Sequence, residues 1–184
     1  MNQLRRAVFL DRDGVISVNR EDYVKSWEEF SFLPDIFEPL QKLARSDYLV
    51  VVTSNQSAVG RDLMAVKTLE DIHKRMKDEI TRQGGRLDGI YYCPHRPDEA
   101  CDCRKPRPGM LFAAARDLNL DLANSFFIGD SRADVEAALN AGASPLLVLT
   151  GRGQDQISRM PADILEHCRV FANLAAAVEW LLNQ

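Results

Sequence analysis

The sequence predicts an α/β fold, a Rossmann-like three-layer α/β/α sandwich around a mainly parallel sheet. Short apolar runs alternate along the chain with longer amphipathic segments, which is the pattern of β-α units. The apolar runs show little polar alternation, as expected for strands that are buried on both faces. Chemically active residue types directly follow these runs. Parallel strands end at one edge of their sheet, where ligands bind in open α/β folds.

The runs rich in apolar or β-branched residues predict strands at 7–10, 49–53, 89–92, 126–128 and 145–149. The amphipathic segments between and after them predict helices over 35–45, 66–83, 108–118, 132–141 and 173–182. The glycines Gly84, Gly85 and Gly142 suit the ends of two of these helices.

The length of 184 residues predicts a single domain over 1–184, with enough chain to bury a sizeable core. The sequence contains no repeat, low-complexity tract or interdomain linker. Two loops, at 14–33 and 93–107, are longer than a β-α unit requires. Long loops in compact domains are usually functional, so these two are expected to shape a site.

Composition and charge narrow the function class. Apolar residues make up 46% and charged residues 27% of the chain, which is ordinary for a globular protein. No apolar stretch approaches the roughly 20 residues that span a bilayer. The start, Met1-Asn2-Gln3-Leu4-Arg5-Arg6, leads straight into the first strand, so a cytoplasmic location is expected. A net charge of −4 without a long basic face argues against nucleic acid as a partner and fits a small anionic ligand.

The run Phe9-Leu10-Asp11-Arg12-Asp13-Gly14-Val15 places two carboxylates where the first strand should end. Asp11 can attack phosphorus, Asp13 can handle a proton, and both can help to hold a divalent cation. The alternative is an ordinary turn whose aspartates cap the chain or face solvent. Matching residues downstream, each after its own strand or loop, favour the chemical interpretation.

Two of these downstream residues suit phosphate binding. Ser54 follows the second strand, where a hydroxyl and free backbone N–H groups can hold phosphoryl oxygens. Thr53 should still belong to that strand, so Ser54 is the preferred ligand of the two. Lys105 brings a compact positive charge, and the neighbouring Arg104 can bind a second anion with both arms. An ordinary polar loop and a solvated basic turn are the alternatives.

A third carboxylate, Asp130, follows the fourth strand in the run Phe127-Ile128-Gly129-Asp130-Ser131. Together with Asp11 and Asp13 it makes an oxygen-rich site suited to Mg²⁺. A helix N-cap is the alternative role for Asp130. Asp134 is either an orienting partner of Lys105 or an acid of the first helical turn.

The 93–107 loop carries four metal-ligand side chains. Cys93 and His95 are followed by Cys101 and Cys103 within an eleven-residue span. Four soft or borderline ligands match a closed tetrahedral zinc site, and a redox role is weaker because C-x-C lacks the spacer of thioredoxin-like motifs. We expect a structural Zn²⁺ that holds Arg104 and Lys105 in place.

The remaining candidates are expected to be structural. His73 lies on a helix face and is predicted to be solvated. His167 and Cys168 lie near the C-terminus and are predicted to pack or to face solvent. Trp27 and Phe30 are predicted to pack the first long loop.

These motifs resemble those of the haloacid dehalogenase superfamily. The resemblance rests on Asp11-Arg12-Asp13-Gly14, Ser54-Asn55-Gln56-Ser57, Lys105-Pro106 and Gly129-Asp130, and covers about residues 5–150. Cys93-Pro94-His95 with Cys101-Asp102-Cys103 is similar to the zinc loop of its capless histidinol-phosphate and heptose-bisphosphate phosphatase group.

The resemblance implies a phosphatase mechanism. Asp11 would form an aspartyl-phosphate, while Asp13 would protonate the leaving oxygen and then activate water. Mg²⁺ would bind the Asp11 carboxylate, the Asp13 backbone carbonyl and Asp130. Ser54 and Lys105 would stabilise the transferring phosphoryl group. The implied substrate is heptose 1,7-bisphosphate, which loses its C7 phosphate on the route to ADP-heptose and the lipopolysaccharide core.

The resemblance also implies substrate contacts from loops near the site: Asn19, Arg20, Asn55, Gln56, Ser57, Arg104 and Ser131. Arg104 is the best candidate for the distal phosphate. The chain departs from the family pattern in its short zinc loop, in Ser131 where lysine is frequent, and in Ser57-Ala58-Val59-Gly60-Arg61 for S-G-I-A-R. These changes affect sugar and anomer preference and leave the chemistry intact.

Two alternatives stay open. The same chemistry could act on histidinol phosphate or on another small sugar phosphate. A zinc-stabilised binding module that has lost catalysis is the alternative from a different class. A monomer is expected, with no membrane or nucleic-acid partner.

Overall fold

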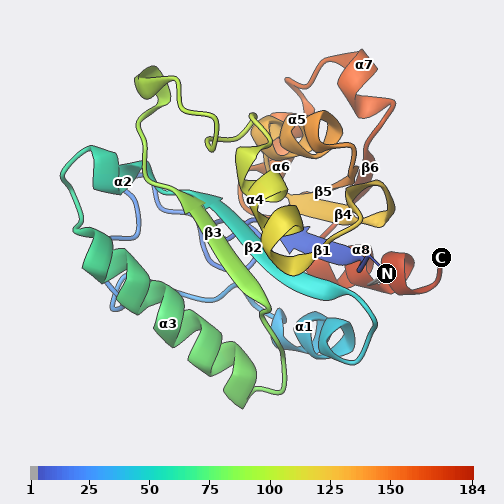
Figure 1. The fold of residues 1–184 in the computed structure, drawn as a ribbon, viewed down its shortest axis with the longest axis horizontal. Coiled ribbons are helices and arrows are strands. Elements are labelled where there is room, and N and C mark those ends of the chain that lie inside the picture. The colour runs from blue at the N-terminus through green and yellow to red at the C-terminus, as the bar shows by residue number, and fades with distance from the viewer. Residues whose placement is uncertain (1–3) are drawn as a thin grey trace.

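The computed structural model describes residues 4–184, so the predicted start at Met1 to Gln3 lies outside the described residues. One six-stranded sheet with the order β3-β2-β1-β4-β5-β6 runs through the middle of the molecule, and all its strand pairs are parallel (Figure 1). The strands are β1 Ala7–Leu10, β2 Leu49–Asn55, β3 Gly89–Cys93, β4 Phe126–Gly129, β5 Ser144–Val148 and β6 Arg169–Phe171.

The helices fill the connections between the strands. The longer ones are α1 Phe37–Ala44, α3 Val66–Arg82, α4 Gly109–Leu118, α5 Arg132–Ala141 and α8 Leu174–Leu182. The short ones are α2 Ser57–Gly60, α6 Gly153–Ile157 and α7 Ala162–Leu165, with 3₁₀ turns η1 Pro97–Glu99 and η2 Leu122–Asn124. The predicted five strands and five helices are therefore confirmed, with boundaries that shift by a few residues.

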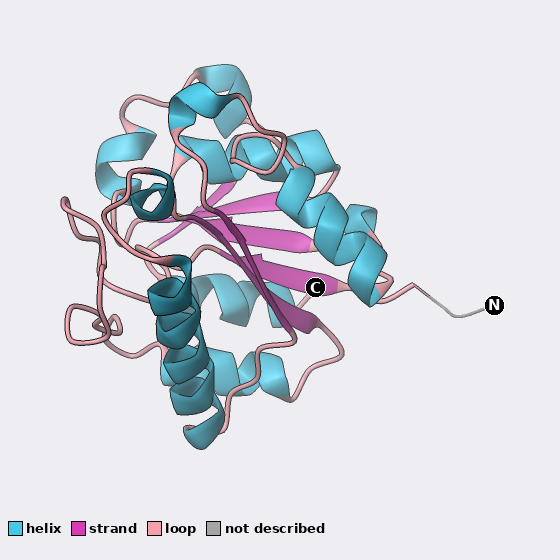
Figure 2. Ribbon diagram, turned by 60° about the vertical axis from the view of Figure 1, so that its left-hand side comes forward, coloured by secondary structure: helices cyan, strands magenta, loops and turns pink. Residues whose placement is uncertain are grey.

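The sheet separates two helical layers (Figure 2), and alternate residues of each central strand point to opposite layers. On β1, Val8 and Leu10 pack with α1, α3 and α8, whereas Ala7 and Phe9 pack with α4 and α5. Each strand side chain of β1 is fully buried. This two-sided burial explains why the strand reads as a continuous apolar run.

Strand β6 and the short helices α2, α6 and α7 are absent from the predicted elements. β6 is a three-residue edge strand, with Arg169 and Val170 exposed, so it has no apolar run. Helices of four or five residues are too short to show a 3.6-residue period. These elements could not be found from hydrophobic patterning.

Strand β2 extends two residues beyond its predicted end at Thr53. Ser54 and Asn55 continue the parallel register against Tyr92 and Cys93 of β3. The apolar pattern ends earlier than the backbone pairing because these last residues are polar. They consequently reach the site as strand residues, held by the sheet.

The catalytic candidates lie at the carboxyl edge of the sheet, where β1 ends between β2 and β4. Chain order proceeds from β1 through β2 to β3 on one side, and from β4 through β6 on the other. This reversal is the topological switch point at which open α/β folds bind ligands. In residues 4–184, no helix is long and apolar enough to cross a membrane.

Candidate active site and metal-ligand cluster

A pocket of about 520 Å³ opens at the switch point. Every residue predicted to catalyse, to bind substrate or to hold Mg²⁺ lines it: Asp11, Asp13, Asn19, Arg20, Ser54, Asn55, Gln56, Ser57, Arg104, Lys105, Asp130 and Ser131. The structure thus brings these residues together from the ends of β1, β2 and β4 and from the loop after β3. Their individual chemical roles stay predictions.

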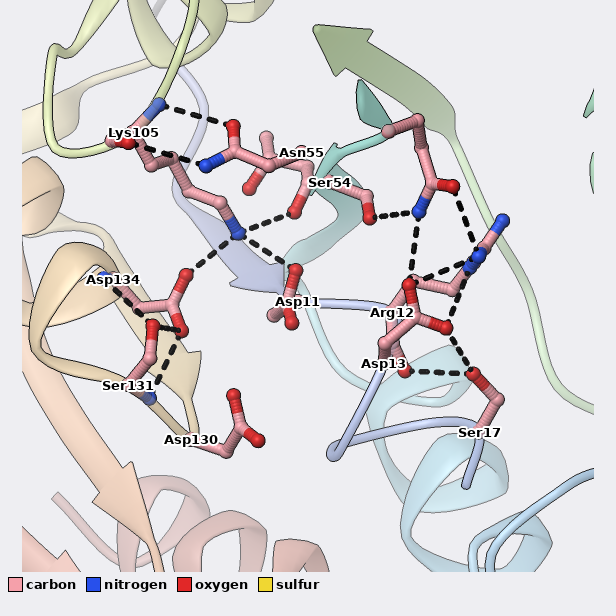
Figure 3. A network of polar contacts seen from close by, with 12 residues as sticks. Asp11, Arg12, Asp13, Ser17, Ser54, Asn55, Lys105, Asp130, Ser131 and Asp134 are labelled. Carbon is pink, nitrogen blue, oxygen red and sulfur yellow. Dashed lines mark hydrogen bonds and ion pairs between the residues drawn. The ribbon is translucent and has the colours of Figure 1, made fainter. Parts of the chain in front are cut away.

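Lys105 lies buried at the centre of the site (Figure 3), with an exposed fraction of 4%. Its Nζ atom lies 2.6 Å from Asp11 Oδ1 and 2.6 Å from Asp134 Oδ1, and donates to the Thr53 carbonyl at 2.9 Å. Burial by itself lowers the pKa of Lys105, but the two carboxylates outweigh this effect and raise it. Lys105 therefore stays a charged ammonium beside the nucleophile candidate.

The Lys105 backbone is held as firmly as its side chain. The Asn55 side-chain amide donates to the Lys105 carbonyl and accepts from the Lys105 N–H, both at 3.1 Å. The following Lys105–Pro106 peptide bond is cis. Asn55 thus fixes the loop at the lysine, and its predicted contact with substrate would come in addition to this role.

The hydroxyls of Thr53 and Ser54 lie in different surroundings. Thr53 is fully buried, and its Oγ1 atom has no hydrogen-bond partner within residues 4–184. Ser54 lines the pocket, where its Oγ atom accepts from Gln56 Nε2 at 2.7 Å. The geometry favours Ser54 as the phosphate ligand.

Asp134 fills both roles that the sequence left open. It is the third residue of helix α5, where Ser131 N and Oγ donate to its Oδ2 atom at 3.1 and 2.6 Å. Its other oxygen, Oδ1, pairs with Lys105. The helix cap therefore orients the carboxylate that orients the lysine.

Three buried carboxylates, from Asp11, Asp130 and Asp134, each place an oxygen within 4.8 Å of the others. Burial, together with Asp134, raises the pKa of Asp130 to about 6, and burial raises the pKa of Asp11 as well. Lys105 supplies one positive charge to these three acids. Carboxylate oxygens short of positive charge fit Mg²⁺, and Asp11 and Asp130 stay its predicted side-chain ligands.

Asp130 sits in a close-fitting cradle. Its Oδ2 atom accepts from Asn19 Nδ2 and from the Arg152 backbone N–H, each at 2.8 Å. A Cβ atom on Gly14, whose φ is +99°, or on Gly151, whose φ is +57°, would collide with this carboxylate. These positions require glycine because the backbone approaches Asp130 so closely.

The Asp13 carboxylate lies apart from the three-acid cluster and points toward Arg12 and Ser17 (Figure 3). Arg12 donates to both of its oxygens, from Nε at 3.1 Å and from Nη2 at 2.9 Å. Ser17 Oγ donates to Oδ1 at 3.0 Å, and Gln56 Nε2 donates to Oδ2 at 2.9 Å. The Asp13 carboxylate is therefore not among the clustered acids, and its backbone carbonyl remains the predicted magnesium ligand.

The prediction that His73 is solvated is wrong. His73 has an exposed fraction of 5% and lies on the buried stripe of α3, with Leu69, Ile72, Met76 and Ile80. Its ring packs against Tyr92, and its Nε2 atom lies 3.2 Å from Arg12 Nη1. The helical spacing of His73 with these apolar residues was the signal that could have predicted its burial. Arg12 was likewise not among the predicted functional residues.

The predicted zinc ligands converge in the loop after β3. The Sγ atoms of Cys93, Cys101 and Cys103 lie 3.1 to 3.5 Å apart, and His95 Nδ1 lies 3.2 Å from Cys103 Sγ. These sulfurs are too far apart for a disulfide, which needs about 2.05 Å. Zinc–sulfur bonds of about 2.3 Å would separate the sulfurs by about 3.8 Å, close to what is observed. The cluster can hold one Zn²⁺.

The substitution Cys101→Ser should remove bound zinc, because a hydroxyl replaces one of four thiolate or imidazole ligands. Metal analysis of the purified protein should find about one zinc per wild-type chain and nearly none in the variant. Cys168→Ser, outside the cluster, is the matched control and should keep its zinc. A Cys101→Ser protein with full zinc content would contradict the assignment.

Magnesium should stabilise the protein more at pH 7.5 than at pH 5. Because the folded-state pKa of Asp130 is raised to about 6, this residue lowers the stability of the metal-free protein as pH rises from about 4 to about 6. Mg²⁺ binds the deprotonated acids and offsets this loss by about 2.7 kcal/mol at 100 times its Kd. Thermal unfolding with and without Mg²⁺ tests this, with Asp130→Asn as the comparison. An equal gain at both pH values would contradict it.

The chain is similar to proteins of known name over nearly its whole length. A family model described as HAD-hydrolase-like matches residues 102–177. The D-glycero-beta-D-manno-heptose-1,7-bisphosphate 7-phosphatase of Pseudomonas putida is 40% identical over 177 residues, covering 96% of this chain and 99% of that protein. The protein of the same name from Bordetella bronchiseptica is 40% identical over 179 residues, covering 97% and 99%.

Solved structures agree with the sequence relatives. The D,D-heptose 1,7-bisphosphate phosphatase from B. bronchiseptica, complexed with magnesium and phosphate, matches with a TM-score of 0.90 at 40% identity, covering 97% of this chain and 98% of that one. The corresponding enzyme of Burkholderia thailandensis matches with a TM-score of 0.75 at 32% identity over 98% of this chain and 100% of that one. With its pocket, its acid cluster and these end-to-end matches, the chain belongs to the heptose-bisphosphate phosphatase family of the haloacid dehalogenase superfamily.

Proposed function

We propose that this protein is a Mg²⁺-dependent phosphatase that removes the C7 phosphate of D-glycero-β-D-manno-heptose 1,7-bisphosphate, on the route to ADP-heptose and the lipopolysaccharide core. The observation that carries the proposal is the buried Asp11–Lys105 pair beside Asp130, at the floor of a pocket in a chain that matches relatives of this name from end to end. We specify the β anomer because the relatives from Pseudomonas putida and Bordetella bronchiseptica carry it in their names.

In the first step, an Asp11 carboxylate oxygen attacks phosphorus and the bond between phosphorus and the sugar oxygen breaks. Asp13 gives a proton to the departing oxygen, and the phosphoryl group is left on Asp11 as an acyl phosphate. Lys105 and the Ser54 hydroxyl face this group and offset its charge. In the second step Asp13 takes a proton from water, the water oxygen attacks phosphorus, and Asp11 is released with inorganic phosphate.

The chain's own residues prepare the nucleophile. Lys105 binds Oδ1 of Asp11, which opposes the effect of burial on the pKa of that carboxyl and fixes its direction. Mg²⁺, held by Asp11, the Asp13 carbonyl and Asp130, would supply further positive charge for the phosphoryl oxygens. Asn19 and the Arg152 N–H keep Asp130 oriented for that role.

The mouth of the pocket suits a second phosphate. Besides the buried Arg12, the pocket is lined by five exposed or half-buried arginines, namely Arg20, Arg61, Arg104, Arg132 and Arg152. Arg104 directly follows the last cysteine of the metal cluster, and its Nη1 atom donates to the His95 carbonyl at 3.3 Å. The zinc loop therefore fixes the position of the arginine that we assign to the distal phosphate.

We also propose a domain organisation, an oligomeric state and a cellular location for this protein. We take residues 1–184 as one catalytic domain that acts as a monomer, because the lining of the pocket comes from this chain. A cytoplasmic location fits the free cysteines of the metal cluster, which need a reducing compartment. Zinc would be structural, since its four positions are filled by protein side chains.

The test of this proposal is phosphate release with Mg²⁺ from both anomers of heptose 1,7-bisphosphate, fructose 1,6-bisphosphate, histidinol phosphate and p-nitrophenyl phosphate. We expect the β-heptose ester to exceed the α anomer in kcat/KM by about 100-fold, which corresponds to about 2.7 kcal/mol. Asp11→Asn should lose at least about 1,000-fold because it lacks the nucleophile. Asp163→Asn, on α7 and outside the pocket, is the matched control.

Each alternative has its own outcome in this panel. Preference for histidinol phosphate would keep the chemistry and replace the proposed substrate. Failure to release phosphate from any ester above the Asp11→Asn background would favour the binding module.

Arg104→Ala should raise KM for the bisphosphate by about 10- to 100-fold, because a charged hydrogen bond to the distal phosphate is lost. KM for p-nitrophenyl phosphate, which has a single phosphate, should change less than about 3-fold. Arg116→Ala, on α4 and outside the pocket, is the matched control for loss of an arginine. An unchanged KM for the bisphosphate would remove Arg104 from the distal-phosphate site.

A further inference from the structure

Arg12 is a buried charge that touches the proposed acid-base residue. Its exposed fraction is 1%, and Asp13 is its ion-pair partner within the described chain. Two guanidinium nitrogens, Nε and Nη2, hold the two Asp13 oxygens in a two-pronged arrangement. Such a pairing fixes the plane of the carboxylate as well as its distance.

The third nitrogen of Arg12 is held by His73. A guanidinium has donors and no acceptor, so the 3.2 Å contact requires His73 Nε2 to accept from Arg12 Nη1. The ring must then be neutral, with its proton on Nδ1. Burial and the adjacent Arg12 charge lower the pKa of His73 to about 3, which agrees with a neutral ring.

His73 is itself held rigidly. Its ring packs against Tyr92 of β3, with the centroids 5.5 Å apart, and its helix buries Leu69 and Met76 beside it in the core. The Arg12 guanidinium also lies 6.0 Å from the centre of the Phe30 ring. A chain of contacts therefore runs from the helix α3 core through His73 and Arg12 to Asp13.

We infer that His73 is a positioning residue, which aligns Arg12 so that its guanidinium holds the Asp13 carboxylate in the orientation needed for proton transfer. This inference rests on the proposed phosphatase function. His73 is not among the residues that line the pocket, and it acts through Arg12. Without His73, the Arg12 guanidinium would hold the Asp13 carboxylate less precisely. Misplacement of a catalytic group by about 1 Å can lower the rate by about 100-fold.

The leaving group separates this role from a purely structural one. A sugar oxygen is a poor leaving group and needs a proton from Asp13, whereas p-nitrophenolate departs without one. The parameter kcat/KM reports the first phosphoryl transfer, so loss of proton donation should affect the sugar ester selectively. A general loss of folded protein would lower kcat/KM for both substrates equally.

The experiment compares His73→Leu with His73→Gln in the full-length zinc- and magnesium-loaded protein. Leucine removes the acceptor for Arg12, whereas the glutamine amide oxygen can replace it. We expect His73→Leu to lower kcat/KM by about 10- to 100-fold for the heptose ester and by less than about 3-fold for p-nitrophenyl phosphate. His73→Gln should stay within about 3-fold of wild type for both. His167→Leu, at an exposed position, is the matched control.

Arg12→Lys keeps the result interpretable if His73→Leu fails to fold. Lysine preserves the charge but cannot hold both Asp13 oxygens and His73, so it should show the same selective loss. Three outcomes would overturn the inference. His73→Leu and Arg12→Lys could lower kcat/KM equally for the two substrates, or could leave it unchanged. His73→Gln could be as impaired as His73→Leu. A wild-type protein that turns over neither substrate would overturn the proposed function, and the inference with it.

Discussion

The buried ion pair between Lys105 and Asp11 is the interaction on which the rest of the site depends. An ammonium taken out of water is unfavourable unless opposite charges surround it, and here Asp11 and Asp134 both lie 2.6 Å away. That requirement brings together the end of β1, the start of α5 and the loop after β3. The Asn55 amide then fixes the lysine backbone to the end of β2. The contacts that neutralise the Lys105 charge therefore also hold four chain segments together at the proposed site.

The metal-ligand loop extends this arrangement to the mouth of the pocket. Four ligand side chains gather within residues 93–103, and the two residues that follow are Arg104 and Lys105. This one cluster therefore positions two cations, Lys105 at the buried end of the pocket and Arg104 nearer its opening. Because Arg104 and Lys105 are neighbours in this loop, the position of the loop sets where both cations start, and the proposed recognition of two phosphates on one small molecule depends on it.

The parts of the structure that followed from the sequence are those with strong local signals. Buried runs such as Ala7 to Leu10 marked strands, and carboxylates directly after them marked the site edge. Asp134 could be named but not assigned, because its pairing with Lys105 joins residues that lie far apart in the chain. The burial of His73 was not predicted because a histidine is polar. Its spacing with Leu69 and Met76 nevertheless places it on the core face of the helix. Long-range polar contacts leave no periodic trace, so the contacts of Gln56 with Asp13 and of His73 with Arg12 could not be predicted.

The burial of Arg12 has a consequence for how this protein can change over evolutionary time. Within the described chain, Asp13 is the carboxylate that neutralises this guanidinium, so the residue proposed for proton transfer is also needed by the fold. Replacing Asp13 with a neutral side chain would leave a positive charge in the interior, which proteins tolerate poorly. Mutational drift that loses Asp13 and keeps the fold would therefore have to alter Arg12 as well. The carboxylate proposed for proton transfer is thus protected by selection for stability as well as by selection for activity.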